Sequence, residues 1–237
     1  RERISAQGTV IKPLDKITLR LQLEKAYKNN IQSVAIVFMH GYQFPTHEQV
    51  ALKIAEKIGF KQISVSHSTS PLMKLIARGD TTLADAYLSP ILNSYVDQVR
   101  CGLGQHLGNT PLLFMQSHGG LTGAEAFQGK DSVLSGPAGG VVGMVRTAMT
   151  ANLKKLIGFD MGGTSTDVSL YDGDFERTTS AVIAGVRITA PMMRVQTVAA
   201  GGGSILKLSL NRLQVGPESA GAHPGPACYR NNGPITV

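Results

Sequence analysis

Apolar and polar residues recur with two different periods along the chain, and the periods predict both helices and strands. Leu14, Ile17 and Leu21 recur at helical spacing, which predicts an amphipathic helix within residues 14–30. Residues 31–39 (IQSVAIVFM) form a nearly continuous apolar run, as expected of a buried parallel strand. This mixture indicates an α/β protein.

The second helix carries start and stop signals. We expect Thr46 to be its N-cap, with Gln49 completing a capping box, and Gly59 to end it. Residues 63–65 then predict a short strand, and residues 67–71 (HSTSP) a polar loop.

The longest helical pattern covers residues 80–104. Pro90 lies inside it and is expected to kink the helix or divide it in two. Its apolar members recur every four residues and are expected to face the core: Leu83, Tyr87, Ile91, Tyr95, Val99 and Leu103. Residues 111–115 (PLLFM) predict a further buried strand.

The stretch with the clearest candidate chemistry is GFDMGGTSTDVSLYDG, residues 158–173. Apolar runs on both sides predict two strands with the glycines in the turn between them. Asp172 and Gly173 then predict a second turn of hairpin type.

The turn of this hairpin has the composition of an anion site. Glycines let consecutive backbone N–H groups line a concave surface, hydroxyls add donors, and carboxylates can hold Mg²⁺. The residues concerned are Asp160, Gly162, Gly163, Thr164, Ser165, Thr166 and Asp167. The pattern suits a nucleotide phosphate with its metal. It is not a P-loop, because no Lys follows the glycines. A glycine-rich hairpin with ordinary turn residues is the alternative.

Other glycine-rich segments extend the pattern. Gly201, Gly202, Gly203 and Ser204 follow an apolar stretch, and their backbone can lie flat against a planar or anionic group or form a flexible loop. Residues 134–143 predict a helix whose first residue is Pro137. Residues 215–229 are expected to form an ordered loop without regular structure.

Two histidines follow predicted strands, where α/β proteins tend to bind ligands. They are His40 and His118, and core or turn positions are the alternatives for both.

Composition excludes several classes of function. The 237 residues include no Trp, and the net charge of +7 comes from scattered Lys and Arg residues, so a nucleic-acid-binding domain is the weakest interpretation. Cys101 and Cys228 have no metal-like spacing and are expected to be free thiols, which favours a reducing, cytoplasmic location, with one disulfide between them as the alternative. No apolar run is long enough to cross a membrane. The chain does not begin with Met, and we expect a segment of a longer protein.

Six motifs in one order resemble the hydantoinase A/5-oxoprolinase family. They are MHGYQFPTHEQ (39–49), FMQSHGGL (114–121), LSGPAGGVVG (134–143), GFDMGGTSTDVSLYDG (158–173), TVAAGGGSI (197–205) and VGPESAGAHPGPACY (215–229). Within the family, these motifs are most similar to those of the members that open 5-oxo-L-proline. At position 118 the family pattern leads us to expect Asn or Asp, and this chain has His118.

The resemblance implies part of an actin-like ATPase (ribonuclease H-like) fold. A parallel βαβ layer, residues 1–152, would complete a first lobe, and antiparallel hairpins, residues 153–237, would begin a second, nucleotide-binding lobe. It also implies ATP and Mg²⁺ as cofactors. Asp160 to Asp167 is similar to the fold's second phosphate loop, and Gly201 to Ser204 resembles its adenosine-side loop. Asp160 and Asp167 are the implied metal-binding and catalytic residues.

The implied reaction is ATP-dependent hydrolysis of a small lactam, 5-oxo-L-proline, to L-glutamate through a phosphorylated lactam. The family's first phosphate loop and its hydantoinase B-like half are absent from these residues, so we expect the chain to be inactive alone. The implied partners are those parts of a parent homo-oligomer. Alternatives are the ATPase subunit of a hydantoinase or acetone-carboxylase-type enzyme, and a nucleotide-dependent switch without metabolic chemistry. The role of His223 is open.

Overall fold

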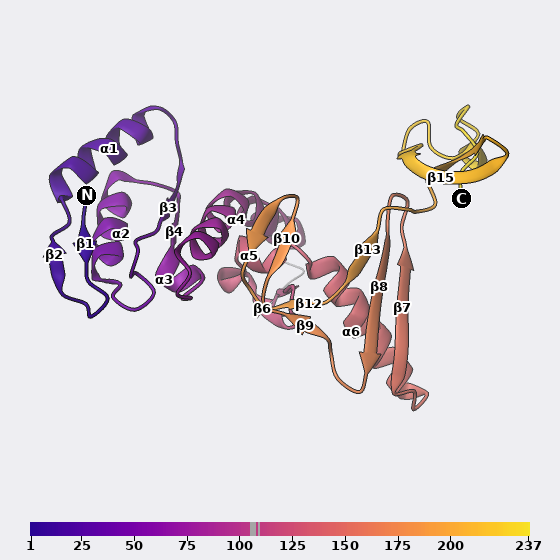
Figure 1. The fold of residues 1–237 in the computed structure, drawn as a ribbon, viewed down its shortest axis with the longest axis horizontal. Coiled ribbons are helices and arrows are strands. Elements are labelled where there is room, and N and C mark those ends of the chain that lie inside the picture. The colour runs from indigo at the N-terminus through magenta and orange to yellow at the C-terminus, as the bar shows by residue number, and fades with distance from the viewer. Residues whose placement is uncertain (105–107, 109) are drawn as a thin grey trace. The chain divides into compact units, whose positions relative to one another are not determined.

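The computed structural model describes residues 1–104, 108 and 110–237, and the chain forms two compact units (Figure 1). Unit 1 contains residues 1–135 and 178–192, and unit 2 contains residues 136–177 and 193–237. Residues 178–192 therefore belong to unit 1, although the residues on both sides of them in the sequence belong to unit 2. The division between lobes at residues 152 and 153 stays a prediction.

Unit 1 begins with an α/β layer built around a parallel pair of strands. Ser33 pairs with Gln62 and Ile36 with Val65, which confirms parallel pairing. Helix α2 packs against both strands. The elements are β1 (Arg3–Ile4), β2 (Val10–Lys12), α1 (Lys16–Lys28), β3 (Ser33–Ile36), α2 (Thr46–Ile58) and β4 (Gln62–Val65).

A small apolar core holds this layer together. Leu14, Ile36, Ala51 and Val65 are buried in contact with one another. Burial of such side chains contributes about 1.5–3 kcal/mol for each large one.

Two local predictions for this layer are wrong. The N-cap of α2 is Pro45, and no side chain caps the helix, so the predicted capping box does not form. Of the three apolar positions predicted for the first helix, Leu14 is buried but precedes α1, whereas Ile17 is 76% exposed and Leu21 is 61% exposed. The predicted end of α2 is confirmed, because Gly59 adopts a φ of 103°, which glycine adopts without strain.

The rest of unit 1 is built along one long helix. Helix α4 runs without division through Pro90, so of the two predicted outcomes, a kink or a division, the division is absent. Residues 66–69 form a short helix rather than a loop. The strand predicted at 111–115 forms an antiparallel hairpin rather than joining a parallel layer. The elements are α3 (Ser66–Thr69), α4 (Leu75–Leu103), β5 (Leu113–Met115), β6 (Leu121–Gly123), a 3₁₀ turn (Ala124–Ala126), α5 (Gly129–Ser132), β10 (Ala181–Ile183) and β11 (Val186–Ile188).

The predicted apolar stripe of α4 does not face the core of unit 1. Leu83, Tyr87, Ile91 and Tyr95 are 57–72% exposed. The buried face carries small and polar residues instead: Ala77, Arg78, Thr81, Thr82, Asp85, Ala86, Ser89 and Val96. These polar groups are buried because they have hydrogen-bond partners within unit 1.

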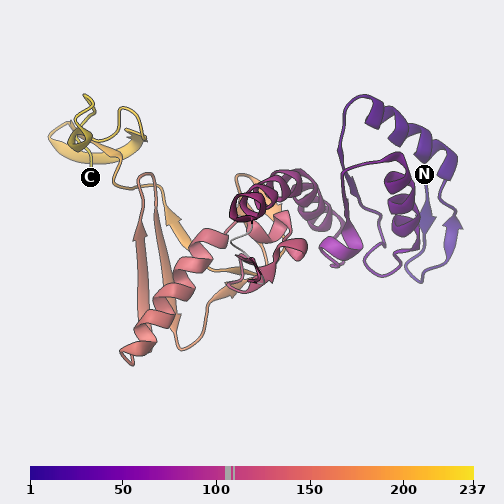
Figure 2. The same ribbon diagram turned by 180° about the vertical axis from the view of Figure 1, so that it is seen from behind.

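Unit 2 contains a three-stranded antiparallel sheet in the order β13-β8-β7, with α6 running beside it (Figure 2). A separate hairpin of β14 and β15 follows. The strand β15 includes residues 215–219, so that part of the predicted irregular loop is regular structure. The elements are α6 (Ser135–Thr150), β7 (Lys155–Met161), β8 (Thr166–Asp172), β9 (Arg177–Thr178), β12 (Met192–Met193), β13 (Gln196–Val198), β14 (Ser204–Ser209), β15 (Arg212–Ser219) and a 3₁₀ turn (Ala227–Tyr229), with β9 and β12 at the crossings between the units.

Candidate functional site

The glycine-rich hairpin forms as predicted. Strands β7 and β8 pair in unbroken register from Lys155 opposite Asp172 to Met161 opposite Thr166. The turn between them is residues 162–165, closed by the N–H of Gly162, which donates to the carbonyl of Ser165 at 2.9 Å. The predicted phosphate loop is therefore the tip of a regular hairpin.

Two acidic residues flank this tip at paired positions of the two strands. Asp160 lies directly opposite Asp167, and side chains opposite each other in an antiparallel pair share one face of the sheet. Thr197, on β13, donates its hydroxyl to Asp167 Oδ1 at 2.6 Å. Like charges directly opposite are destabilising. A cation between or beside the two carboxylates would relieve that repulsion, so the donor set fits a metal ion.

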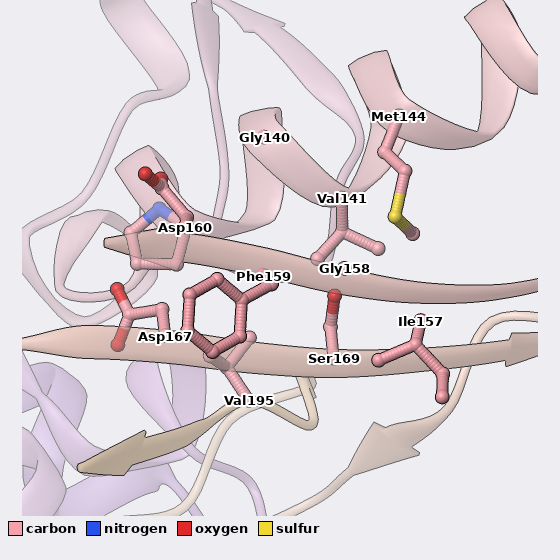
Figure 3. Close-up of a pocket in the computed structure, with 11 residues that line it drawn as sticks. Gly140, Val141, Met144, Ile157, Gly158, Phe159, Asp160, Asp167, Ser169 and Val195 are labelled. Atoms are coloured by element: carbon pink, nitrogen blue, oxygen red, sulfur yellow. The ribbon is translucent and has the colours of Figure 1, made fainter. Parts of the chain in front are cut away.

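The same face of the hairpin forms the floor of a pocket of about 310 Å³ (Figure 3). Asp160, Asp167 and Ser169 line it from the hairpin, and Gly140 and Met144 line it from α6. Gly158 lets α6 approach this floor. An added Cβ at Gly158 would contact the Ser169 hydroxyl and lie 2.8 Å from the sulfur of Met144.

The second glycine loop docks directly onto the first. Gly202 donates its N–H to the carbonyl of Gly162 at 2.9 Å, and Gly203 donates to the carbonyl of Gly163 at 2.6 Å. Gly201 has no room for a side chain, because a Cβ there would lie 2.6 Å from the Gly162 oxygen. The two loops that the sequence singled out separately thus form one backbone assembly.

Two hydroxyls predicted to meet a ligand also hold this assembly together. Thr166 donates to the carbonyl of Ala200 at 2.6 Å, and the Ser204 hydroxyl accepts from the N–H of Gly201 at 3.0 Å. Both residues are buried. Thr164, in contrast, is exposed at the tip and Ser165 is half-buried.

The tip offers backbone donors to a ligand. Within the part of the chain that the structure describes, no acceptor is found for the N–H groups of Gly163, Thr164 and Ser165. Successive unpaired amides in a turn form an anion-binding concavity. Their position beside Asp160 and Asp167 matches the needs of a phosphate group that carries a metal ion.

A metal held by protein groups alone does not fit. In residues 1–104, 108 and 110–237, no cluster of three or more His, Cys, Asp and Glu side chains could hold an ion. Mg²⁺ typically uses one or two carboxylates and takes its other ligands from phosphates and water. The Asp160 and Asp167 pair therefore fits Mg²⁺ only in company with a phosphate ligand.

The histidines considered from sequence lie elsewhere. His118 accepts from the N–H of Gly120 at Nδ1, at 3.2 Å, and its Nε2 lies 3.0 Å from Gln116 Oε1, so it serves the β5–β6 turn. His40 packs near Tyr42, with ring centroids 6.5 Å apart. The sequence analysis missed Thr197, although its alternation with Gln196 and Val198 on β13 could have placed it beside Asp167.

Other described features agree with the composition. Cys101 and Cys228 are exposed free thiols, as predicted. Among the described residues, no helix is both long and apolar enough to cross a membrane.

Comparisons with known proteins place these features in a family. The model of the hydantoinase/oxoprolinase family matches residues 78–237, and the model of its N-terminal region matches residues 1–59. A 5-oxoprolinase of Saccharomyces cerevisiae is 47% identical over 230 residues, which cover 96% of this chain and 18% of that protein. 5-Oxoprolinase 1 of Arabidopsis thaliana is 46% identical over 96% of this chain and also 18% of its own length.

Solved structures agree with the sequence comparisons. The ATP-dependent caprolactamase of Pseudomonas jessenii matches 100% of this chain and 35% of its own, with a TM-score of 0.84 and 32% identity. A nucleotide-free acetone carboxylase matches 98% of this chain and 34% of its own, with a TM-score of 0.77 and 26% identity. The predicted partial actin-like ATPase fold is confirmed by these neighbours, and the chain belongs to the hydantoinase/oxoprolinase family.

Proposed function

We propose that this chain is the ATP-binding segment of an ATP-dependent 5-oxoprolinase, which hydrolyses 5-oxo-L-proline to L-glutamate. One observation carries the proposal. The unpaired amides of Gly163, Thr164 and Ser165 lie at the tip of a hairpin in which Asp160 and Asp167 occupy paired positions on one face. That arrangement, in a chain of this family, supports a site for the phosphates of ATP with Mg²⁺.

Each part of the site has a separate task in this proposal. The three amides bind phosphate oxygens, and the carboxylates of Asp160 and Asp167 hold Mg²⁺ directly or through water. Thr197 orients Asp167 through its hydrogen bond. ATP supplies the phosphoryl group that activates the amide carbonyl of the lactam. Phosphoryl transfer depends mainly on positioned donors and charge, which a rigid backbone assembly provides.

The lactam site and the partners extend beyond this chain. The chain spans about 18% of the length of the curated relatives it matches. We propose that a first phosphate loop, a hydantoinase B-like half and a homo-oligomeric assembly complete a cytoplasmic enzyme. The chain alone would then bind nucleotide without turning over the lactam.

The experiment is Mg·ATP hydrolysis by the full-length protein, with and without 5-oxo-L-proline, for the wild type and Asp160→Asn. Hydrolysis that requires 5-oxo-L-proline and is lost in the variant supports the proposal. Hydrolysis that ignores 5-oxo-L-proline but is lost in the variant would move the substrate to another lactam, a hydantoin or a ketone. An unaffected variant would show that the nucleotide binds elsewhere.

A further inference from the structure

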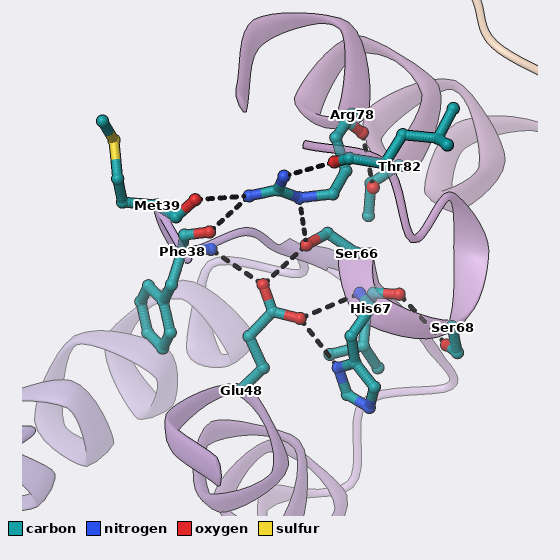
Figure 4. Close-up of polar contacts among 10 residues, drawn as sticks. Phe38, Met39, Glu48, Ser66, His67, Ser68, Arg78 and Thr82 are labelled. Carbon is teal, nitrogen blue, oxygen red and sulfur yellow. Dashed lines mark hydrogen bonds and ion pairs between the residues drawn. The ribbon is translucent and has the colours of Figure 1, made fainter. Parts of the chain in front are cut away.

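A second polar centre lies in unit 1, around a fully buried carboxylate (Figure 4). Glu48 Oε1 accepts from the N–H of Phe38 at 2.8 Å and from the Ser66 hydroxyl at 2.6 Å. Glu48 Oε2 lies 3.0 Å from the N–H of His67 and 2.8 Å from His67 Nδ1. Four polar groups surround one carboxylate, and both of its oxygens act as acceptors.

A fully buried guanidinium completes this centre. All five N–H donors of Arg78 have acceptors, so the group has no donor left for a ligand. The acceptors are the Ser66 hydroxyl and the carbonyls of Leu72, Met73, Phe38 and Met39. Because the Ser66 oxygen accepts from Arg78, its own proton points to Glu48.

This chain of donors assigns the tautomer of His67. The two backbone N–H groups and the Ser66 hydroxyl all donate to Glu48, so the carboxylate is an acceptor throughout. The Nδ1 atom of His67 therefore carries a proton and donates it to Glu48. In a neutral imidazole the remaining nitrogen, Nε2, is then an acceptor. Among the described residues no partner is found for Nε2, and the side chain is 19% exposed.

The position of His67 in the fold is that of a ligand-binding residue. Phe38 and Met39 follow β3, and Ser66 and His67 follow β4, so the centre lies at the carboxyl ends of two parallel strands. Open α/β sheets bind ligands at this edge. The turn after β3 covers the centre. A Cβ added at Gly41 would collide with the Glu48 carboxylate, and Arg78 Cζ lies 5.4 Å from the centroid of the Tyr42 ring.

We propose that His67 Nε2 accepts a hydrogen bond from a ligand N–H at this edge, and that the ligand is the cyclic amide substrate. The choice of ligand rests on the proposed function, whose substrate is a lactam. A lactam carries one N–H, which can donate to Nε2, and one carbonyl. Glu48 is a positioning residue that fixes the tautomer. Ser66 and Arg78 hold Glu48 in turn. A buried carboxylate and guanidinium are costly unless each donor and acceptor is satisfied, and here both are.

The test compares two substitutions that each keep one half of the imidazole. His67→Asn keeps an N–H near the place of Nδ1 and removes the acceptor at Nε2. His67→Gln places a carbonyl oxygen near the position of Nε2 and loses the donor to Glu48. Binding of 5-oxo-L-proline to the full-length protein is measured by calorimetry, together with the melting temperature of each variant.

We expect His67→Asn to keep the wild-type melting temperature and to bind the amide about tenfold more weakly. His67→Gln is expected to melt earlier but to bind more tightly than His67→Asn.

Two results would overturn this inference alone. One is that the two variants rank in amide affinity as they rank in melting temperature, with His67→Asn binding more tightly than His67→Gln. That order is expected if His67 only stabilises the fold. The other is amide binding by the wild type that N-methylation of the lactam leaves unchanged. Loss of lactam-dependent ATP hydrolysis with His67-dependent amide binding intact would contradict only the proposed function. A wild type that binds no 5-oxo-L-proline would overturn both.

Discussion

Asp160 and Asp167 lie directly opposite each other on one face of the β7–β8 hairpin. Facing carboxylates repel in the absence of a cation. The pair is therefore less stable than a neutral pair at the same positions until a metal ion and its phosphate ligand arrive. A substitution that removes one of these charges should therefore weaken metal binding without lowering the stability of the fold.

Asp160→Asn is expected to abolish Mg²⁺-dependent nucleotide binding while leaving the melting temperature equal or higher. The amide removes one charge from the facing pair and weakens coordination of a hard cation. Asp172→Asn is the matched control, because Asp172 lies in the same hairpin but pairs with exposed Lys155. Nucleotide titrations with and without Mg²⁺ check the prediction. Equal losses in both variants would contradict it.

Gly201→Ala is expected to destabilise the chain by about 1–3 kcal/mol and to weaken nucleotide binding. The added methyl group would lie 2.6 Å from the carbonyl oxygen of Gly162 and would push the two loops apart. Gly202→Ala is the neighbouring control, because the nearest atom to its Cβ would be 3.8 Å away. Denaturant melts of both variants provide the comparison. A Gly202→Ala variant as unstable as Gly201→Ala would show that the contact is not responsible.

Gly143→Ala is expected to stabilise the chain by up to about 1 kcal/mol, because Ala has the higher helix propensity. The residue lies within α6, and an added methyl group would meet no atom within 4 Å beyond the backbone of its own helix. Denaturant unfolding measures the change. Destabilisation would indicate that this glycine is needed for a contact outside the described residues.

Arg78→Lys is expected to destabilise the chain by about 3–5 kcal/mol. Lysine cannot reproduce the five donors of a fully buried guanidinium, and the Glu48 carboxylate would lose its link through Ser66. Burial lowers the pKa of Arg78, which shows the direction of the desolvation cost. Arg100→Lys is the control, since Arg100 is exposed and pairs with an exposed Glu125. Chemical denaturation of both variants tests the difference.

Asp15→Ala is expected to destabilise the chain at neutral pH and to lose that effect in acid. Asp15 caps α1 by accepting from the N–H of Thr18 at 3.0 Å and from its hydroxyl at 2.7 Å, and these bonds hold the pKa of Asp15 below its usual value of 3.8. A carboxylate whose pKa is lower in the folded state than in the unfolded state stabilises the fold at pH values above the unfolded-state pKa. This stabilisation is lost as the pH falls through the folded-state pKa. Melting curves of the wild type and Asp15→Ala at pH 7 and below pH 3.8 measure the difference in stability. A constant difference would contradict the assignment.

The hairpin site could be predicted from sequence because its signals are local. Two apolar runs with Gly162 and Gly163 between them define strands and a turn, and the period of two puts Asp160 and Asp167 on one face. The docking of Gly201–Gly203 on that turn could not be predicted from pattern alone. It depends on backbone contacts between segments 40 residues apart, which leave no periodic trace in the chain.

The burial of α4 could not be predicted for a related reason. An apolar stripe shows that a helix has a face to cover but does not show which part of a protein covers it. Tyr87 and Ile91 are exposed here, whereas Thr81 and Asp85 are buried because they are hydrogen-bonded within unit 1. The centre around Glu48 escapes prediction likewise, because the polarity of residues 67–71 alone favours a loop.

The docking of the two glycine loops has a consequence for how this family can vary. Because an added Cβ at Gly203 would lie 2.7 Å from the backbone oxygen of Gly163, no change of side chain at the neighbouring turn can make room for a larger residue. In a random library, single substitutions at positions 201 and 203 should therefore abolish function, and no second-site substitution should restore it. The two loops would be inherited as one unit, exchangeable between relatives only together.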